Sequence, residues 1–162
     1  MGLPRETLLR RINTELRECS EHLKTEISPV MDDRPFPLEI TMTLRGIPAY
    51  ALDGDEIVLI KDHTMMVIID EEFGFKKPSI RWMTPIFHPN IMMPSDGGYI
   101  CLHTLDKWEF ASHLISVVQG VEQLIMHPNP KSPFSTDSCM KASEYFINND
   151  SKVEVSVKYG GR

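Results

Sequence analysis

The chain has 162 residues, of which 41% are hydrophobic, a length and composition that fit one domain around a single core. Its net charge of −6 argues against nonspecific binding to nucleic acid or to an anionic membrane, because both need a positive protein surface. We therefore expect protein partners, with no nucleic acid and no membrane among them.

The first predicted element is an amphipathic helix from residue 4 to about residue 27. Its apolar positions recur at steps of three or four, which places them on one face: Leu8, Ile12, Leu16, Cys19 and Leu23. Pro4 suits a first helical turn because its missing N–H would have no partner there, and Ser28-Pro29 ends the run.

Four strands are predicted next, where apolar residues run or alternate at strand length between turn-like Gly and Asp residues. They cover residues 37–44, 55–60, 64–70 and 79–84. The link at residues 61–63 is short enough for a hairpin. We therefore expect an antiparallel meander of four strands.

Residues 85 to about 110 contain Pro, Gly and Asp without periodicity, which predicts an ordered but irregular loop, and long loops in compact domains are usually functional. Helical spacing returns at residues 111–127 and 136–148. The predicted fold class is therefore α+β, with an N-terminal helix, a four-stranded antiparallel meander, an irregular loop and two helices packed on the sheet. We expect one domain over residues 1–149 and a strand-like or flexible tail over residues 150–162.

Cysteine usage and the lack of apolar segments bear on the compartment. Three cysteines at unrelated spacings do not predict a disulfide framework, which favours a reducing environment. No apolar run has the length of a signal peptide or of a membrane span. These features predict a soluble, cytoplasmic protein.

Four short motifs follow one another in register with these elements: Phe87-His88-Pro89-Asn90, Gly98-Tyr99-Ile100-Cys101-Leu102, Trp108, and His127-Pro128-Asn129-Pro130. In this order and spacing they resemble the ubiquitin-conjugating enzymes, and the likeness covers about residues 4–149. The absence of the family's final helix predicts a divergent, compact member with a shortened C-terminus. The resemblance implies a UBC-like fold.

The resemblance also implies a function, namely transfer of ubiquitin or a ubiquitin-like protein. In the family, a cysteine accepts the modifier from an activating enzyme as a thioester and passes it to a substrate lysine or to a ubiquitin ligase. No cofactor is implied, because ATP is used by the activating enzyme.

Cys101 is the predicted thioester nucleophile. A thiol attacks as its thiolate, and strong activation is unnecessary here because the incoming carbonyl is already a thioester. One alternative is a buried, inert thiol. Another is a metal ligand beside His103 and His88, but nothing in the spacing nominates a fourth ligand, and we predict no metal.

The motif around Asn90 is expected to shape the site. The resemblance gives Asn90 one of two roles, either stabilising the oxyanion of the tetrahedral intermediate or holding the active-site loop in shape. A plain turn residue after proline is the third alternative. His88 is structural by family likeness, with an imidazole that hydrogen-bonds to backbone and fixes the turn.

The acceptor side departs from the family pattern. The family often has acidic residues on the loop after the Pro-Asn-Pro motif and two positions after the cysteine, where this chain has Ser132 and His103. The stretch between Asn90 and Cys101 is about three residues longer than is common in the family, and its Asp96 is a candidate for the missing carboxylate. We expect slow transfer to free lysine without a partner.

Partner surfaces follow from the same resemblance. The family's activating enzyme docks on the first helix, often through basic residues, and Arg5, Arg10 and Arg11 cluster there, although a merely solvated face is the alternative. Ligases bind a hydrophobic spot to which Phe75 and Phe110 correspond. For Phe110 a core contact is the alternative.

Two rival functions belong to other classes. An inactive variant that binds ubiquitin would lack the cysteine, whereas this chain keeps Cys101 and Asn90. A cysteine hydrolase needs a histidine base oriented by a third group. His103 stands too close to Cys101 in sequence for that geometry to be assumed.

Overall fold

The computed structural model describes residues 2–149. The elements are α1 (Arg5–Leu23), β1 (Leu38–Leu44), β2 (Ala49–Asp53), β3 (Glu56–Ile60), β4 (His63–Ile69), β5 (Ser79–Trp82), the 3₁₀ turn η1 (Pro94–Asp96), α2 (His103–Asp106), α3 (Leu114–Met126) and α4 (Asp137–Asn148). The predicted α+β class, with its N-terminal helix, antiparallel strands and later helices, is confirmed. The predicted tail at residues 150–162 lies outside the described residues. Within residues 2–149, no helix combines the length and apolar character that a membrane crossing needs.

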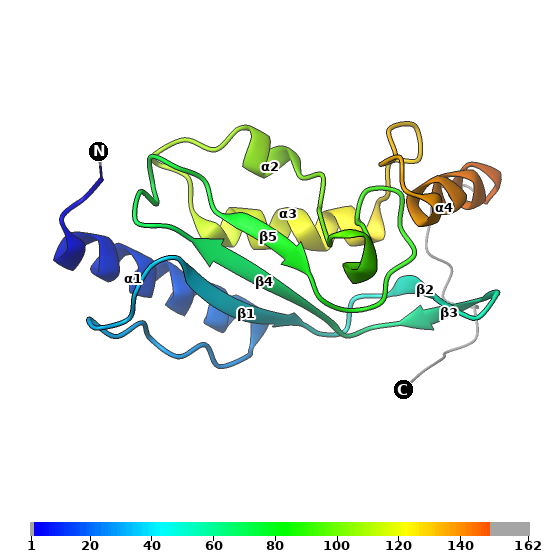
Figure 1. Cartoon of the computed structure of the whole chain (residues 1–162). Coiled ribbons are helices and arrows are strands. Elements are labelled where there is room, and N and C mark those ends of the chain that lie inside the picture. Colours follow the sequence, from blue (N-terminus) through cyan, green and yellow to red (C-terminus); the bar gives the residue numbers. More distant parts are fainter. Residues whose placement is uncertain (1, 150–162) are drawn as a thin grey trace.

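The main core lies between a three-stranded sheet and two helices. Figure 1 shows β1, β4 and β5 crossing in front of α1 and α3. Every second residue of β1 and β4 is buried, so one face of the sheet is turned toward these helices. The buried side chains of α1 complete this core, among them Leu8, Ile12 and Leu16. The amphipathic spacing of the first helix therefore reflects its contact with the sheet and with α3.

The strand pairing differs from the expected four-stranded meander. β1 pairs with β4 and β4 with β5, all antiparallel, whereas β2 and β3 form a separate two-stranded sheet. β2 was not predicted, and the prediction of a hairpin at residues 61–63 is wrong. The turn instead lies at Gly54, whose φ of 64° suits glycine.

The two sheets belong to one long two-stranded ribbon, in which β1 and β2 lie beside β4 and β3. The Ile47 N–H donates to the Lys61 oxygen, so β3 runs on into β4 beside β1 and β2 rather than folding back. The break between the two sheets is a bulge, because residues 45–48 lie opposite residues 61–62, and Pro48 within it has no N–H to donate to a ladder. The short link at residues 61–63 therefore joins two segments of one continuous ribbon, and the predicted hairpin there is wrong.

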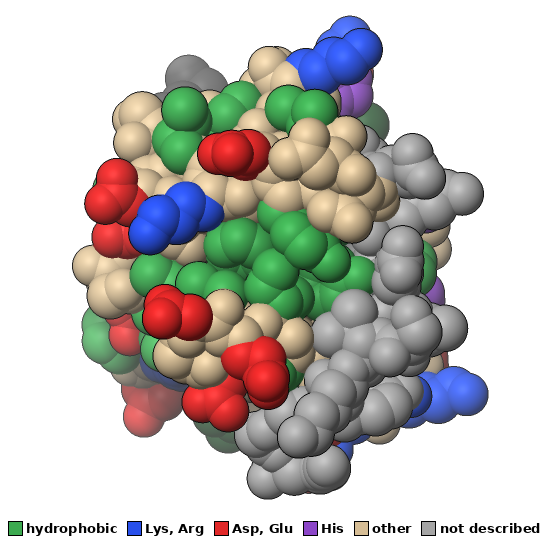
Figure 2. Space-filling model, turned by 90° about the vertical axis from the view of Figure 1, so that its right-hand side faces the viewer, with side chains coloured by type: hydrophobic (Ala, Val, Ile, Leu, Met, Phe, Trp, Pro, Cys, Tyr) green, Lys and Arg blue, Asp and Glu red, His purple; other side chains and the backbone are tan. Residues whose placement is uncertain are grey.

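A second, smaller core joins the β2–β3 hairpin to α4 and consists of Tyr50, Leu59, Phe87, Ala142 and Phe146. Figure 2 looks onto this end of the molecule and shows hydrophobic side chains gathered at its centre, with acidic side chains beside them. The Phe87 N–H also donates to the Tyr50 oxygen at 2.7 Å. This core therefore fixes the start of the His88-Pro89-Asn90 segment.

Candidate active site

Cys101 lies on a short ladder that follows the His-Pro-Asn segment. The Cys101 N–H donates to the Asn90 oxygen at 3.0 Å, and the Met92 N–H donates to the Tyr99 oxygen at 2.8 Å. These two bonds hold the backbone of the cysteine in place while its side chain is exposed. The predicted nucleophile is thus an accessible group on a fixed backbone.

The residues between Asn90 and Cys101 form an ordered turn built on η1. The Trp82 N–H donates to the Gly98 oxygen at 2.8 Å, which ties the turn to β5. A Cβ at Gly98, where φ is 66°, would lie 2.6 Å from the Trp82 oxygen, so this close approach requires glycine. Asp96 is exposed on this turn.

The three thiols have different environments. Cys19, on the predicted apolar face of the first helix, is buried in the core, Cys139 is buried too, and Cys101 is exposed. Burial, with a smaller contribution from Glu15, raises the pKa of Cys19 to about 12, and burial also raises the pKa of Cys139. Both core thiols therefore stay protonated and inert at neutral pH.

Asn90 is buried, with a side chain fully engaged by the loop after α3, residues 127–136. Its Nδ2 donates to the backbone oxygens of Asn129 and Ser132 at 3.0 and 3.1 Å, and its Oδ1 accepts from the Asn129 N–H at 2.7 Å. Both amide hydrogens are thereby used within the protein. Of the two family roles, this geometry favours holding the loop over donating to an oxyanion.

His88 is buried directly behind this segment. Its Nε2 lies 2.7 Å from the Leu124 oxygen and its Nδ1 accepts from the Asn90 N–H at 3.0 Å, a pattern that requires the neutral tautomer with hydrogen on Nε2. Burial lowers the pKa of His88 to about 4. A neutral imidazole without solvent access braces the turn and is not placed to act as a base.

Cys101 opens onto a groove of about 550 Å³ between α2, α3 and the loop after α3. Three other predicted residues line the same groove: Asn90, His103 and Ser132. Asp96 does not line it, so the structure gives no support to Asp96 as the missing carboxylate. Instead, the structure places Asp106 in the groove. Asp106 was not predicted, because the single three-residue step from His103 is too short to stand out as helical in an otherwise irregular stretch.

Close packing of α2 on α3 forms one wall of the groove. A Cβ at Gly120 would lie 2.9 Å from the Thr104 Oγ1 and 3.4 Å from the Leu102 Cδ1. The missing side chain at Gly120 thus lets the one-turn helix sit against α3. Glycine is unfavourable inside a helix, and this close packing explains why α3 has one at Gly120.

No metal centre emerges from the described residues. Across residues 2–149 there is no group of three or more His, Cys, Asp or Glu side chains that could hold an ion. Both His88 nitrogens are engaged in hydrogen bonds within the protein, so neither is free to bind an ion in this conformation.

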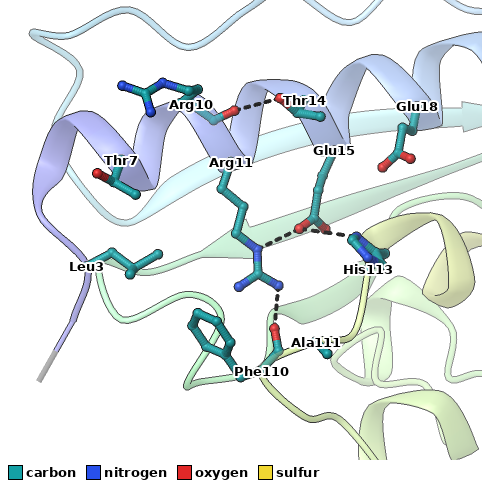
Figure 3. A pocket seen from close by; sticks show the side chains of 10 residues that line it. All are labelled: Leu3, Thr7, Arg10, Arg11, Thr14, Glu15, Glu18, Phe110, Ala111 and His113. Atoms are coloured by element: carbon teal, nitrogen blue, oxygen red, sulfur yellow. Dashed lines mark hydrogen bonds and ion pairs between the residues drawn. The ribbon is translucent and has the colours of Figure 1, made fainter.

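A second groove, of about 600 Å³, runs along α1 (Figure 3). At its centre the Arg11 Nε donates to the buried Glu15 at 2.7 Å, and the Arg11 Nη2 donates to the oxygens of Phe110 and Ser112, both at 2.8 Å. The other Glu15 oxygen accepts from the Leu114 N–H at 2.8 Å. This network joins α1 to the start of α3.

The three predicted arginines do not form one free basic cluster. Arg5 donates to the oxygens of Asp32 and Arg34. The Arg11 side chain is 17% exposed and lies over the Phe110 ring, with its guanidinium carbon 4.8 Å from the centroid. Within residues 2–149 the Arg10 side chain, at 69% exposure, has one ion pair, with Glu6 on its own helix at 3.3 Å. Arg10 is therefore the arginine of the three most open to a partner's charge.

Phe75 and Phe110 form one exposed aromatic pair. Their ring centroids are 4.6 Å apart, and the residues are 57% and 45% exposed. Phe110 is therefore a surface residue rather than a core contact. The structure brings together the residues that the resemblance assigns to the ligase, and Arg11 packs against them.

Comparison with known sequences places this site in a family. The family profile described as "Ubiquitin-conjugating enzyme" matches residues 11–157. Ubiquitin-conjugating enzyme E2 T of Homo sapiens is 37% identical over 76 residues, covering 44% of this chain and 37% of that protein. Ubiquitin-conjugating enzyme E2 N of Macaca fascicularis is 36% identical over 72 residues, covering 44% of this chain and 45% of that protein. The matches thus span less than half of the length of these curated relatives.

Solved structures share the fold. The E2 domain of a Toxoplasma gondii ubiquitin conjugating enzyme aligns with a TM-score of 0.61 and 19% identity, covering 87% of each chain. S. cerevisiae Ubc12 aligns with a TM-score of 0.58 and 21% identity, covering 92% of this chain and 82% of that one. These neighbours confirm the predicted UBC-like fold. With the family profile matching most of its length, the chain belongs to the ubiquitin-conjugating enzyme family.

Proposed function

We propose that the protein carries ubiquitin or a ubiquitin-like protein as a thioester on Cys101 and transfers it to a substrate lysine or to a ligase. The Cys101 thiolate attacks the thioester carbonyl carbon on the activating enzyme. The bond from that carbon to the activating enzyme's sulfur breaks, and the departing thiolate takes up a proton. Thiol and thioester are thereby exchanged without net loss of the high-energy bond.

The observation that carries this proposal is the contrast between Cys101 and the other two thiols. Cys101 is exposed at the mouth of a groove, on a backbone fixed by hydrogen bonds to Asn90. Cys19 and Cys139 are buried, with raised pKa values. Only an accessible thiol can meet a carbonyl on another protein.

The partners follow from the family and from the two surfaces along α1. The activating enzyme, which consumes the ATP, is expected to meet α1 near Arg10, while a ligase uses the exposed Phe75 and Phe110 as anchors. The protein itself needs no cofactor for thioester exchange. A cytoplasmic location fits this role and the acidic composition.

The test is a loading assay on a nonreducing gel. The protein is incubated with ATP and with activating enzymes, each paired with its ubiquitin-like protein, and one pairing should give an adduct that thiol reagents remove. Cys101→Ala should abolish the adduct, whereas Cys101→Ser should convert it to a more stable oxyester. The matched control Cys139→Ala, which removes a buried thiol, should keep it. No adduct with any pairing, or an adduct that persists in Cys101→Ala, contradicts the proposal.

A further inference from the structure

The groove beside Cys101 holds a carboxylate at a position where the resemblance does not place one. Asp106 lines this groove together with Cys101, His103 and Ser132. Among the described residues that line it, Asp106 is the one acid. The two positions where the family often has acids carry histidine and serine instead, so Asp106 is the local source of negative charge.

The one-turn helix α2 aims Asp106 at the groove. His103 and Asp106 are three residues apart and share a helix face, whereas Leu105 is buried on the other side and anchors the turn. The close approach of Thr104 to Gly120 further holds α2 against α3. The carboxylate therefore belongs to a fixed wall rather than to a free loop.

The Asp106 carboxylate is also uncommitted. Within residues 2–149 it forms no ion pair and accepts no hydrogen bond. Asp70 shows the contrast, since it pairs with Lys76 at 2.7 Å. Both Asp106 and Cys101 are exposed. A cationic group entering the groove would thus find an unpaired carboxylate on the same surface as the thioester.

We propose that Asp106 is the acceptor-side catalytic residue, which binds the ammonium group of the incoming lysine and removes its proton. This inference rests on the proposed function. The carboxylate takes one proton from the ammonium, and the resulting amine attacks the thioester carbonyl carbon. The bond from that carbon to the Cys101 Sγ then breaks, with its electron pair going to sulfur. The second amine proton protonates the thiolate, and Asp106 releases its proton to water.

Neither neighbouring side chain can supply both parts of this role. Ser132 can accept a hydrogen bond from an amine but carries no charge to attract an ammonium ion. A protonated His103 would repel the ammonium, and a neutral one offers no charge. A carboxylate both attracts the acceptor and takes its proton. Transfer without a ligase should remain slow, yet depend on Asp106.

The experiment is single-turnover discharge of a preformed Cys101 thioester, with free lysine and with hydroxylamine as separate acceptors. Asp106→Asn should load normally and slow discharge to lysine by about tenfold or more, a modest effect for general base catalysis. It should change discharge to hydroxylamine by less than about twofold, because hydroxylamine is already uncharged at neutral pH. Asp106→Glu should restore part of the lysine rate.

The matched control is Asp96→Asn, which removes the same charge from the turn outside the groove and should leave both discharge rates unchanged. Equal slowing with both acceptors in Asp106→Asn would mean a disturbed site and would overturn the assignment. Unchanged lysine discharge, or failure of Asp106→Asn to load, would overturn it too. Failure of the wild-type protein to load instead refutes the proposed function itself.

Discussion

The groove beside Cys101 and the groove along α1 are built in opposite ways. In the first, buried Asn90 and His88 fix the surrounding loops from behind, and the exposed Asp106 carboxylate on the surface stays uncommitted. In the second, the side chains along the groove are already engaged with one another, with Arg11 bound to buried Glu15 and to the Phe110 oxygen.

On the proposed function, this difference separates the groove for chemistry from the groove for docking. A reaction needs groups that are free to bind a substrate on a rigid support. A docking surface gains from side chains that are already ordered, because less conformational entropy is lost when the partner binds. Changes to the first groove should therefore act through the buried residues behind it, and changes to the second through the contacts among the side chains that line it.

Removing the support of the first groove should have the largest effect. Asn90→Ala deletes three hydrogen bonds to the loop after α3, and we expect the free energy of unfolding to fall by about 4 kcal/mol. Urea unfolding measures this. The control Ser132→Ala keeps all three bonds, since the bond to residue 132 reaches its backbone oxygen, and should change stability by less than about 0.5 kcal/mol. A stable Asn90→Ala protein with roughly thousandfold slower transfer would instead favour the oxyanion role.

Acid should weaken the same support. Burial lowers the pKa of His88 from 6.5 to about 4, so the unfolded chain binds a proton in this range that the folded protein excludes. Above pH 6.5 the titration of His88 therefore leaves the free energy of unfolding unchanged. As the pH falls from 6.5 to 4, this free energy decreases by about 3 kcal/mol, and below pH 4 it decreases no further on account of His88. His63 has a lowered pKa too and adds a loss of the same sign.

Urea unfolding at several pH values, compared with His88→Gln, isolates the histidine. The variant is expected to be less stable at neutral pH, but to lose about 3 kcal/mol less than the wild type between pH 6.5 and 4. His63 remains in both proteins, so the difference reports the His88 titration together with the effect of the His63 charge on it. Parallel curves for the two proteins would show that His88 does not titrate as its burial requires.

Most helices and strands could be predicted from the periodicity of apolar residues, but the pairing of the strands could not. The apolar spacing of α1 and the alternation of β1 and β4 reflect one buried face each, which is a local signal. Which strands pair depends on contacts between distant segments. The run Ala49–Asp53 has few β-branched or aromatic residues and follows proline, so β2 gave little signal of its own.

The residues of the candidate active site likewise differ in whether they could be predicted from the sequence. Cys101 and Asn90 could be located because their motifs are contiguous in sequence, and the two residues meet through one backbone hydrogen bond. Asp106 was missed because a helix of one turn is too short to show a period. Asp96 was chosen for its nearness in the chain, yet the turn at Gly98 carries it out of the groove.

Breaking the network of the second groove should cost less than removing Asn90. Glu15→Ala removes the partner of the Arg11 Nε and of the Leu114 N–H, and we expect a loss of about 2 kcal/mol in the free energy of unfolding. The loss is moderate because Arg11 keeps its bonds to the oxygens of Phe110 and Ser112. The control Glu18→Ala, an exposed acid of the same helix, should shift thermal unfolding very little. Equal losses in both variants would mean that the buried network contributes nothing beyond ordinary helix surface.

The smallest effect is expected where the second groove meets solvent. Among the described residues, the Arg10 side chain pairs with the exposed Glu6 alone, so Arg10→Ala should change the free energy of unfolding by less than about 0.5 kcal/mol. If the activating enzyme docks on this helix, the same change should lower the loading rate at limiting activating enzyme by roughly threefold, because a rim charge acts mainly on association. Added salt should reduce the difference between wild type and variant, since it screens that attraction. Arg11→Ala, by contrast, should lose stability along with loading. An unchanged loading rate for Arg10→Ala would leave this arginine as a solvated charge and would contradict docking of the activating enzyme at this position.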